Sequence, residues 1–195
     1  MPIRDGLHLA PELRSLLRPG QRVRDRLGHT HTLPRYFLEI PSWEEAKSRQ
    51  ATPHFTYAEL LVVDCREADP LLNSFPHYVP FAVQVLAQYL ERFRAAVEAP
   101  VHIATNGGYR SPSHRYHARH AGAHCWACAA DIYRIGDTCL DDEKSIERYR
   151  RIAENLGQEV RAKPFGHGQD ETDDHLHIDI GYVILTPGDI DEGQP

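Results

Sequence analysis

Long apolar runs are absent from this chain of 195 residues. No stretch approaches the roughly 20 consecutive apolar residues that a membrane-spanning helix needs, so we expect no membrane span. Residues 1–5 also lack the apolar stretch that marks a secretory signal. We therefore expect synthesis in the cytoplasm, so that any role outside the cell would require lysis or a specialised export route.

Positive charge is also scarce. The chain has 22 Lys and Arg residues against 28 Asp and Glu residues, which gives a formal net charge of −6. Because a phosphate backbone attracts clustered cationic side chains, this balance does not favour a nucleic-acid partner.

Cysteine is limited to four residues, of which Cys125 and Cys128 form a single CxxC. Without a second CxxC, a four-cysteine zinc site is excluded. We interpret these residues as small buried thiols in a reducing compartment. A redox pair or a zinc knuckle at Cys125 and Cys128 is the alternative.

The overall composition, 41% hydrophobic and 26% charged, is typical of a globular protein, and the length suits one compact domain. We expect an N-terminal extension over residues 1–52, a main domain over residues 53–186 and a loose acidic tail over residues 187–195. No internal repeat is visible.

Helical and extended patterns follow one another along the chain. Helices are predicted near residues 11–17, after Ser42, after Thr56, over residues 80–99 and over residues 141–156; strands are predicted over residues 101–105, 131–135, 159–162 and 175–185. Because helices cluster first and strands follow, the order favours an α+β fold with an antiparallel sheet flanked by helices.

The most informative feature is a pair of segments about fifty residues apart. The first runs from His124 to Asp131, and the second contains His175, His177 and Asp179. Two histidines and one aspartate are the three-ligand set of an open zinc site, which leaves one position for water. These residue types therefore suggest metal-assisted hydrolysis.

The spacing within the first segment carries a structural requirement. His124 and Asp131 are seven residues apart, which is about 10 Å along a straight helix. On a straight strand, an odd offset would place them on opposite faces. The two side chains can therefore share a metal only if the chain bends between them, as in a short loop that leads into a strand.

The second segment alternates polar and apolar residues, which is typical of a strand. His175 and His177 then lie on the same face. Alternation alone does not decide which of the two binds metal, and a solvated strand face is the alternative for both.

Four segments, in matching order and spacing, resemble the zinc D-Ala-D-Ala carboxypeptidase family (peptidase family M-fifteen). Residues 54–61 read HFTYAELL, similar to the HFTLAELL opening of its carboxypeptidase C-terminal-like branch. Residues 105–112 read TNGGYRSP, similar to its SGYRSP segment. Residues 122–131 resemble its S-x-H-x-x-G-x-A-x-D signature, and residues 174–177 its carboxylate-x-x-His pair. The resemblance spans roughly residues 53–185.

The resemblance implies the Hedgehog/D-Ala-D-Ala peptidase fold and a site for one Zn²⁺. It implies His124, Asp131 and His177 as metal ligands, because Asp174 stands three residues before His177. Its implied substrate is a peptidoglycan stem peptide with D-amino acids, cut as a D-Ala-D-Ala carboxypeptidase or as an L-Ala-D-Glu endopeptidase.

Further roles follow from the same resemblance. Asp174 would act as the general base. Arg110 would stabilise the developing oxyanion or hold a substrate carboxylate, with a structural ion pair as the alternative. His175 would contact either the metal ligands, from outside the coordination sphere, or the transition state.

The chain departs from the family signature at two positions, where Gly122 replaces Ser and Ala127 replaces Gly. Ala127 is unfavourable only if that position needs a positive φ. A second HxH, at His29 and His31, lacks a carboxylate partner in the family pattern, and we do not expect it to bind metal. These departures leave a second hypothesis, a zinc-stabilised binding module without peptidase activity.

Overall fold

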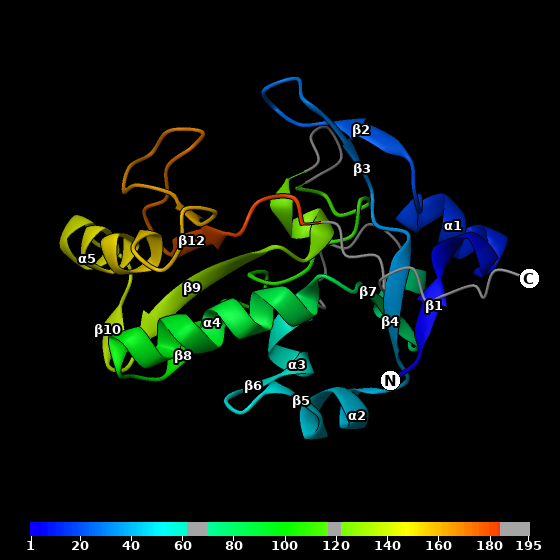
Figure 1. Ribbon diagram of the computed structural model, residues 1–195, viewed down its shortest axis with the longest axis horizontal. Coiled ribbons are helices and arrows are strands. Elements are labelled where there is room, and N and C mark those ends of the chain that lie inside the picture. The colour runs from blue at the N-terminus through cyan, green and yellow to red at the C-terminus, as the bar shows by residue number, and fades with distance from the viewer. Residues whose placement is uncertain (62–69, 117–121, 184–195) are drawn as a thin grey trace, which may run out of the picture.

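The computed structural model describes residues 1–61, 70–116 and 122–183. Within these residues the fold is α+β, with five α-helices and antiparallel sheets (Figure 1). The helices are α1 (Pro11–Leu17), α2 (Trp43–Ser48), α3 (Tyr57–Leu60), α4 (Val83–Val97) and α5 (Glu143–Glu154). The 3-10 helices are η1 (Gly6–His8), η2 (Pro70–Asn73) and η3 (Ala123–Trp126).

The largest sheet is formed by five strands near the C-terminal half of the chain. They are β8 (Val101–Ile103), β9 (Ala129–Ile135), β10 (Thr138–Cys139), β11 (Arg161–Ala162) and β12 (Leu176–Asp179). β9 pairs with β8, β10 and β12, and β12 also pairs with β11. In this register His177 lies directly opposite Asp131.

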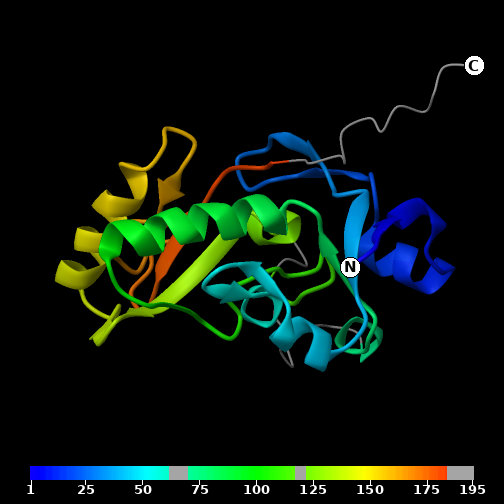
Figure 2. The ribbon, with the colours of Figure 1, turned by 60° about the horizontal axis from the view of Figure 1, so that its bottom comes forward.

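Helices α4 and α5 pack against this sheet and against each other (Figure 2). The helix predicted over residues 80–99 corresponds to α4, which buries an apolar stripe that includes Val83, Leu86, Leu90 and Phe93. The predicted start at Pro80 is wrong, because Pro80 lies in β7 (His77–Pro80) and pairs with Phe37. β7 is an edge strand, where the missing N–H of proline is tolerated.

Several local signals are confirmed. The helix predicted over residues 11–17 is α1. Ser42 accepts a hydrogen bond from the backbone N–H of Glu45 at 3.1 Å and so caps α2. The carboxylate of Glu59 accepts from the backbone N–H of Thr56 at 2.7 Å, the reciprocal half of a capping box. The charged helix α5 is capped by Asp142 but ends at Glu154, two residues before the predicted end at residue 156.

The predicted strand over residues 175–185 is shorter than expected. β12 ends at Asp179, whose carboxylate accepts from the backbone N–H of Gly181 at 2.9 Å. Gly181 has a φ of +73°, which turns the chain out of the sheet. The predicted tail over residues 187–195 lies outside the described residues.

Residues 1–52 contribute strands to three smaller sheets, two of which also contain a strand from beyond residue 52. β1 (Ile3–Asp5) and β4 (Tyr36–Ile40) form a three-stranded sheet with β7, so strand pairing crosses the predicted boundary at residue 52. β5 (Gln50–Thr52) pairs with β6 (Phe55–Thr56). Leu33, Leu38 and Ile40 belong to the same buried core as the main-domain residues.

The remaining pair, β2 (Arg22–Arg24) and β3 (Thr30–Thr32), forms a hairpin that projects from the N-terminal region. In both ribbon views it lies beside the segment that follows β12 (Figures 1 and 2). His31 stacks on Tyr182 in this contact. In the described part of the chain, no helix is long and apolar enough to cross a bilayer.

Candidate metal centre

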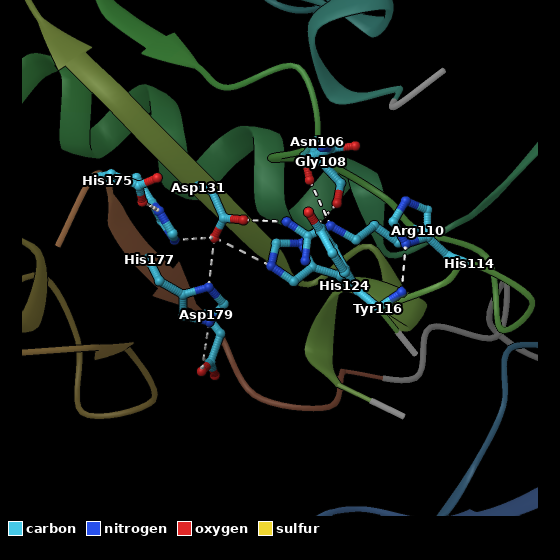
Figure 3. A network of polar contacts seen from close by, with 11 residues as sticks. Asn106, Gly108, Arg110, His114, Tyr116, His124, Asp131, His175, His177 and Asp179 are labelled. Carbon is cyan, nitrogen blue, oxygen red and sulfur yellow. Dashed lines mark hydrogen bonds and ion pairs between the residues drawn. The ribbon is translucent and has the colours of Figure 1, made fainter. Parts of the chain in front are cut away.

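The centre starts from the pairing of β9 with β12. Asp131 and His177 are cross-strand neighbours, which brings their side chains together on one face. The Nδ1 of His177 lies 2.7 Å from the Oδ1 of Asp131 (Figure 3). Both residues are buried.

His124 reaches the same point from η3, the short 3-10 helix before β9. Its Nε2 lies 3.3 Å from the Oδ1 of Asp131. Between them the chain reverses at Ala127, which has a φ of +53°. The bend that the seven-residue offset requires is therefore built on a left-handed residue, at the position where the family signature has glycine. Alanine adopts that conformation at a cost of roughly 1–2 kcal/mol.

The loop after β8 holds the centre from the opposite side. Gly107 accepts a backbone hydrogen bond from Asp131 at 2.8 Å, and a Cβ there would come within 2.4 Å of the carbonyl oxygen of Asp131. A Cβ on Gly108 would come within 2.3 Å of the Leu60 carbonyl. These two positions require glycine because backbone lies against backbone.

The other ring nitrogen of each histidine also has a polar contact, which orients the imidazole. The Nδ1 of His124 donates to the carbonyl of Gly108 at 2.8 Å, which leaves its Nε2 facing Asp131 with a lone pair. The Nε2 of His177 lies 3.7 Å from the Oδ2 of Asp179, on the side away from Asp131. Partners of this kind fix the orientation of metal-binding histidines.

The three residues can hold a metal ion. One ligand atom from each of His124, Asp131 and His177 lies within 4.8 Å of the others. In a tetrahedral zinc site with bonds of about 2.0–2.1 Å, ligand atoms stand about 3.3 Å apart. The 3.3 Å and 2.7 Å separations fit such a site after a small opening between Asp131 and His177.

The pKa values of the three residues reflect burial and the contacts around Asp131. Burial lowers the pKa of His124 to about 4, so its imidazole is neutral at pH 7. Burial opposes ionisation of Asp131, but the neighbouring imidazoles of His124 and His177 hold its pKa well below the usual value. Burial also lowers the pKa of His177, but its hydrogen bond to Asp131 outweighs that effect, so the pKa is raised.

Arg110 makes the structural ion pair that the sequence left open. Its Nη2 pairs with the Oδ2 of Asp131, and its Nε donates to the carbonyl of Asn106 at 2.6 Å. The guanidinium also lies 5.4 Å from the centre of the Tyr116 ring. Arg110 thus holds Oδ2 of Asp131, whereas the imidazoles of His124 and His177 lie against Oδ1.

His175 and Asp174 lie at the edge of the centre. The Nε2 of His175 is 3.5 Å from the Oδ1 of Asp131, and its Nδ1 donates to Asp174 at 2.5 Å. The Asp174 side chain is 81% exposed, so its carboxylate does not face the centre directly. The role predicted for Asp174 stays a prediction, and the structure places His175 between it and the three candidate ligands.

The centre opens into a cleft of about 800 Å³. Its lining carries charges of both signs, with Arg161 and Lys163 as well as Asp170 and Glu171. Residues of the β2–β3 hairpin also line the cleft. The hairpin contacts the segment before β12 where Arg26 donates a hydrogen bond to the carbonyl of Gln169 at 3.2 Å.

The cysteines near the centre are not among its candidate ligands. Cys125 and Cys128 are buried, and burial raises the pKa of Cys128 to about 12. This agrees with their interpretation as small buried side chains. Among the described residues, neither belongs to a cluster that can hold a metal ion.

The hairpin gives His29 and His31 a carboxylate partner that the family pattern does not contain, because it brings Asp25 to both imidazoles. The spacing D-x-x-x-H-x-H across a turn with Gly28 is the sequence signal that could indicate this group.

No protein-family model matches this chain, and no curated protein and no solved structure matches it at a significant level. The resemblance to the zinc D-Ala-D-Ala carboxypeptidases therefore rests on the motif residues themselves, and His124, Asp131 and His177 of those motifs meet in one buried group.

Proposed function

We propose that this chain is a zinc-dependent peptidase of the Hedgehog/D-Ala-D-Ala peptidase fold that hydrolyses peptidoglycan stem peptides. The observation that carries the proposal is the convergence of His124, Asp131 and His177 in the lining of a cleft of about 800 Å³. Three ligands, and no fourth among the described residues, are typical of a catalytic rather than a structural zinc site.

The donor set supports zinc. Two imidazole nitrogens and one carboxylate oxygen suit a borderline-soft divalent ion better than calcium or magnesium, which prefer oxygen ligands. When bound, zinc supplies Lewis-acid activation of water and of the scissile carbonyl.

The chain's own acid–base group is best supplied by His175 together with Asp174. The Nδ1–H of His175 is held by Asp174, so its Nε2 carries a lone pair and points to the centre. His175 Nε2 would accept a proton from the attacking water and return it to the leaving amine. Asp174 would stabilise the imidazolium while the proton resides on His175.

The remaining charged residues would position Asp131 and bind the substrate. Arg110 fixes the carboxylate of Asp131 and, from the cleft wall, lies where an anionic group of the substrate can approach. Arg161 and Lys163 offer positive charge to peptide carboxylates, and Asp170 and Glu171 offer negative charge to amines. Stem peptides carry both kinds of group.

The test is hydrolysis of purified muropeptides by zinc-loaded protein, with products weighed by mass spectrometry. Release of a single D-Ala identifies a D-Ala-D-Ala carboxypeptidase, and cleavage between L-Ala and D-Glu identifies an endopeptidase. His177→Ala should lose activity and the exposed-residue control His8→Ala should retain it. Equal activity of both variants would overturn the proposal.

A second candidate is a zinc-stabilised binding module on the same fold. It is favoured by the outward-facing Asp174 and by the use of Arg110 in an ion pair. In that case muropeptides would bind the cleft without turnover. Calorimetry that detects binding of uncleaved muropeptide to the zinc-loaded protein, with no product after prolonged incubation, would favour the binding module over the peptidase.

A further inference from the structure

A second Asp-His-His group lies in the β2–β3 hairpin. The Oδ2 of Asp25 is 3.3 Å from the Nδ1 of His29 and 2.8 Å from the Nε2 of His31. One ligand atom from each residue lies within 4.8 Å of the other two. Within the described ranges, this group and the buried centre are the two clusters with that property.

The hairpin turn positions Asp25 for this role. Its Oδ1 accepts from the backbone N–H groups of Leu27 and His29, both at 2.9 Å. Those bonds hold one carboxylate oxygen on the turn and leave Oδ2 facing the imidazoles. Gly28, with a φ of +86°, allows the chain to return so that His29 and His31 follow on the same side.

His31 is held in place from its other side. Its ring stacks on Tyr182 with centroids 3.7 Å apart, and its edge faces Trp126 at 5.8 Å. The indole N–H of Trp126 donates to the carbonyl of Thr32 at 2.8 Å. The β3 ligand is therefore fixed against η3, the same short helix that carries His124.

We propose that Asp25, His29 and His31 form a second site for a divalent transition-metal ion of the zinc class. Two imidazole nitrogens and one carboxylate oxygen repeat the donor set of the buried centre, and imidazole ligands select such ions over calcium or magnesium. The 3.3 Å and 2.8 Å separations compare with about 3.3 Å between ligands in a tetrahedral zinc site.

The second site belongs to the same cleft as the first. Asp25, His29 and His31 line it together with His124, Asp131 and His177. An ion on the hairpin would stand in the cleft wall and present its remaining coordination position to a bound ligand. The inference does not depend on peptidase activity, because it concerns a separate set of residues.

The hairpin site should be the weaker of the two. The His29 side chain is 68% exposed and must be ordered when the ion binds. We therefore expect calorimetric titration of metal-free protein with Zn²⁺ to show one tight and one weaker equivalent.

Variants assign the two equivalents. His29→Ala removes an exposed ligand without disturbing the stacked His31, and should abolish the weaker equivalent alone. Asp131→Asn should abolish the tight equivalent and keep the weaker one. His8→Ala is the control for nonspecific binding by an exposed histidine and should keep both.

A second readout follows the hairpin itself. In Asp131→Asn protein, Zn²⁺ should slow tryptic cleavage after Arg26, because the ion would hold the turn from Asp25 to His29. Ca²⁺ should not. The inference would be overturned if His29→Ala binds as much Zn²⁺ as His8→Ala, or if Zn²⁺ leaves cleavage after Arg26 unchanged. Loss of peptidase activity with both equivalents intact would count against the proposed function and not against this site.

Discussion

Two regions of this molecule present an aspartate with two histidines, and they do so by different means. The buried centre takes His124, Asp131 and His177 from a 3-10 helix and two paired strands. In the hairpin, Asp25, His29 and His31 come from a single short segment that includes the turn between β2 and β3. The first is assembled by tertiary structure and the second by local hydrogen bonds.

This difference has energetic consequences. In the buried centre, Gly108, Asp179 and Arg110 orient the ligands from outside. In the hairpin, the backbone N–H groups of the turn orient Asp25, but His29 has no such support and faces solvent. We expect the buried centre to bind metal more tightly and to contribute more to the stability of the fold.

The largest effect on the free energy of unfolding is expected when the aspartate of each group is changed to asparagine. Asp131→Asn leaves the guanidinium of Arg110 buried without its carboxylate, which should cost about 3–5 kcal/mol of unfolding free energy. Asp25→Asn keeps an acceptor for the turn and should cost about 1 kcal/mol. Urea unfolding of both metal-free variants measures this. Similar losses in the two variants would remove the energetic distinction between the regions.

The acid–base pair is the next comparison. His175→Ala should lower kcat by roughly 10²–10⁴-fold, because the imidazole that faces the centre is lost. Asp174→Asn should have a smaller effect, because it acts through His175. The control is His167→Ala, which removes an 80% exposed histidine paired with Asp173 on the same loop. A larger loss in Asp174→Asn than in His175→Ala would return the base role to Asp174.

A smaller effect is expected from the carboxylate behind His177. Asp179→Asn keeps an acceptor for Gly181 but removes the negative charge beside the His177 imidazole. Zinc affinity at the buried centre should fall by about 10–100-fold. The weaker hairpin equivalent should be unchanged, and competition with a chromophoric chelator can measure both. An unchanged tight equivalent would mean that Asp179 has no part in orienting His177.

The smallest effects concern the two turns. Gly28→Ala places a side chain at a φ of +86° with open space around it, so it should cost about 1 kcal/mol of strain. Ala127→Gly relieves a similar strain at +53° but loses a buried methyl group worth about 0.8 kcal/mol. Its net effect on the melting temperature should therefore be close to zero. A marked stabilisation by Ala127→Gly would show that the strain exceeds this estimate.

The sequence predicted the α+β class, the long helix α4 and the helices that begin after Ser42 and Thr56, because these depend on local patterns. The three candidate ligands of the buried centre could be proposed because residue type and motif order point to them. The choice of His177 over His175 came from the family pattern, and in the structure it is His177 that lies opposite Asp131.

Other features depend on contacts that no local pattern contains. Pro80 was placed in a helix because nothing nearby indicates its pairing with Phe37 in an edge strand. The early end of β12 depends on Asp179 capping Gly181. The exposure of Asp174 and the ion pair of Arg110 depend on how loops close over the sheet.

The hairpin cluster was missed for a different reason. Asp25, His29 and His31 are close in sequence, and the turn at Gly28 could have been recognised as bringing them together. The family pattern contains no equivalent of this group, so the resemblance gives these three residues no role.

The most direct test is an anomalous difference map at the zinc absorption edge, from crystals of the full chain grown with zinc. We predict a peak bounded by the Nε2 of His124, the Oδ1 of Asp131 and the Nδ1 of His177, with no fourth protein ligand. Absence of a peak at these atoms, or a peak closed by a fourth protein side chain, would contradict the proposed catalytic zinc centre.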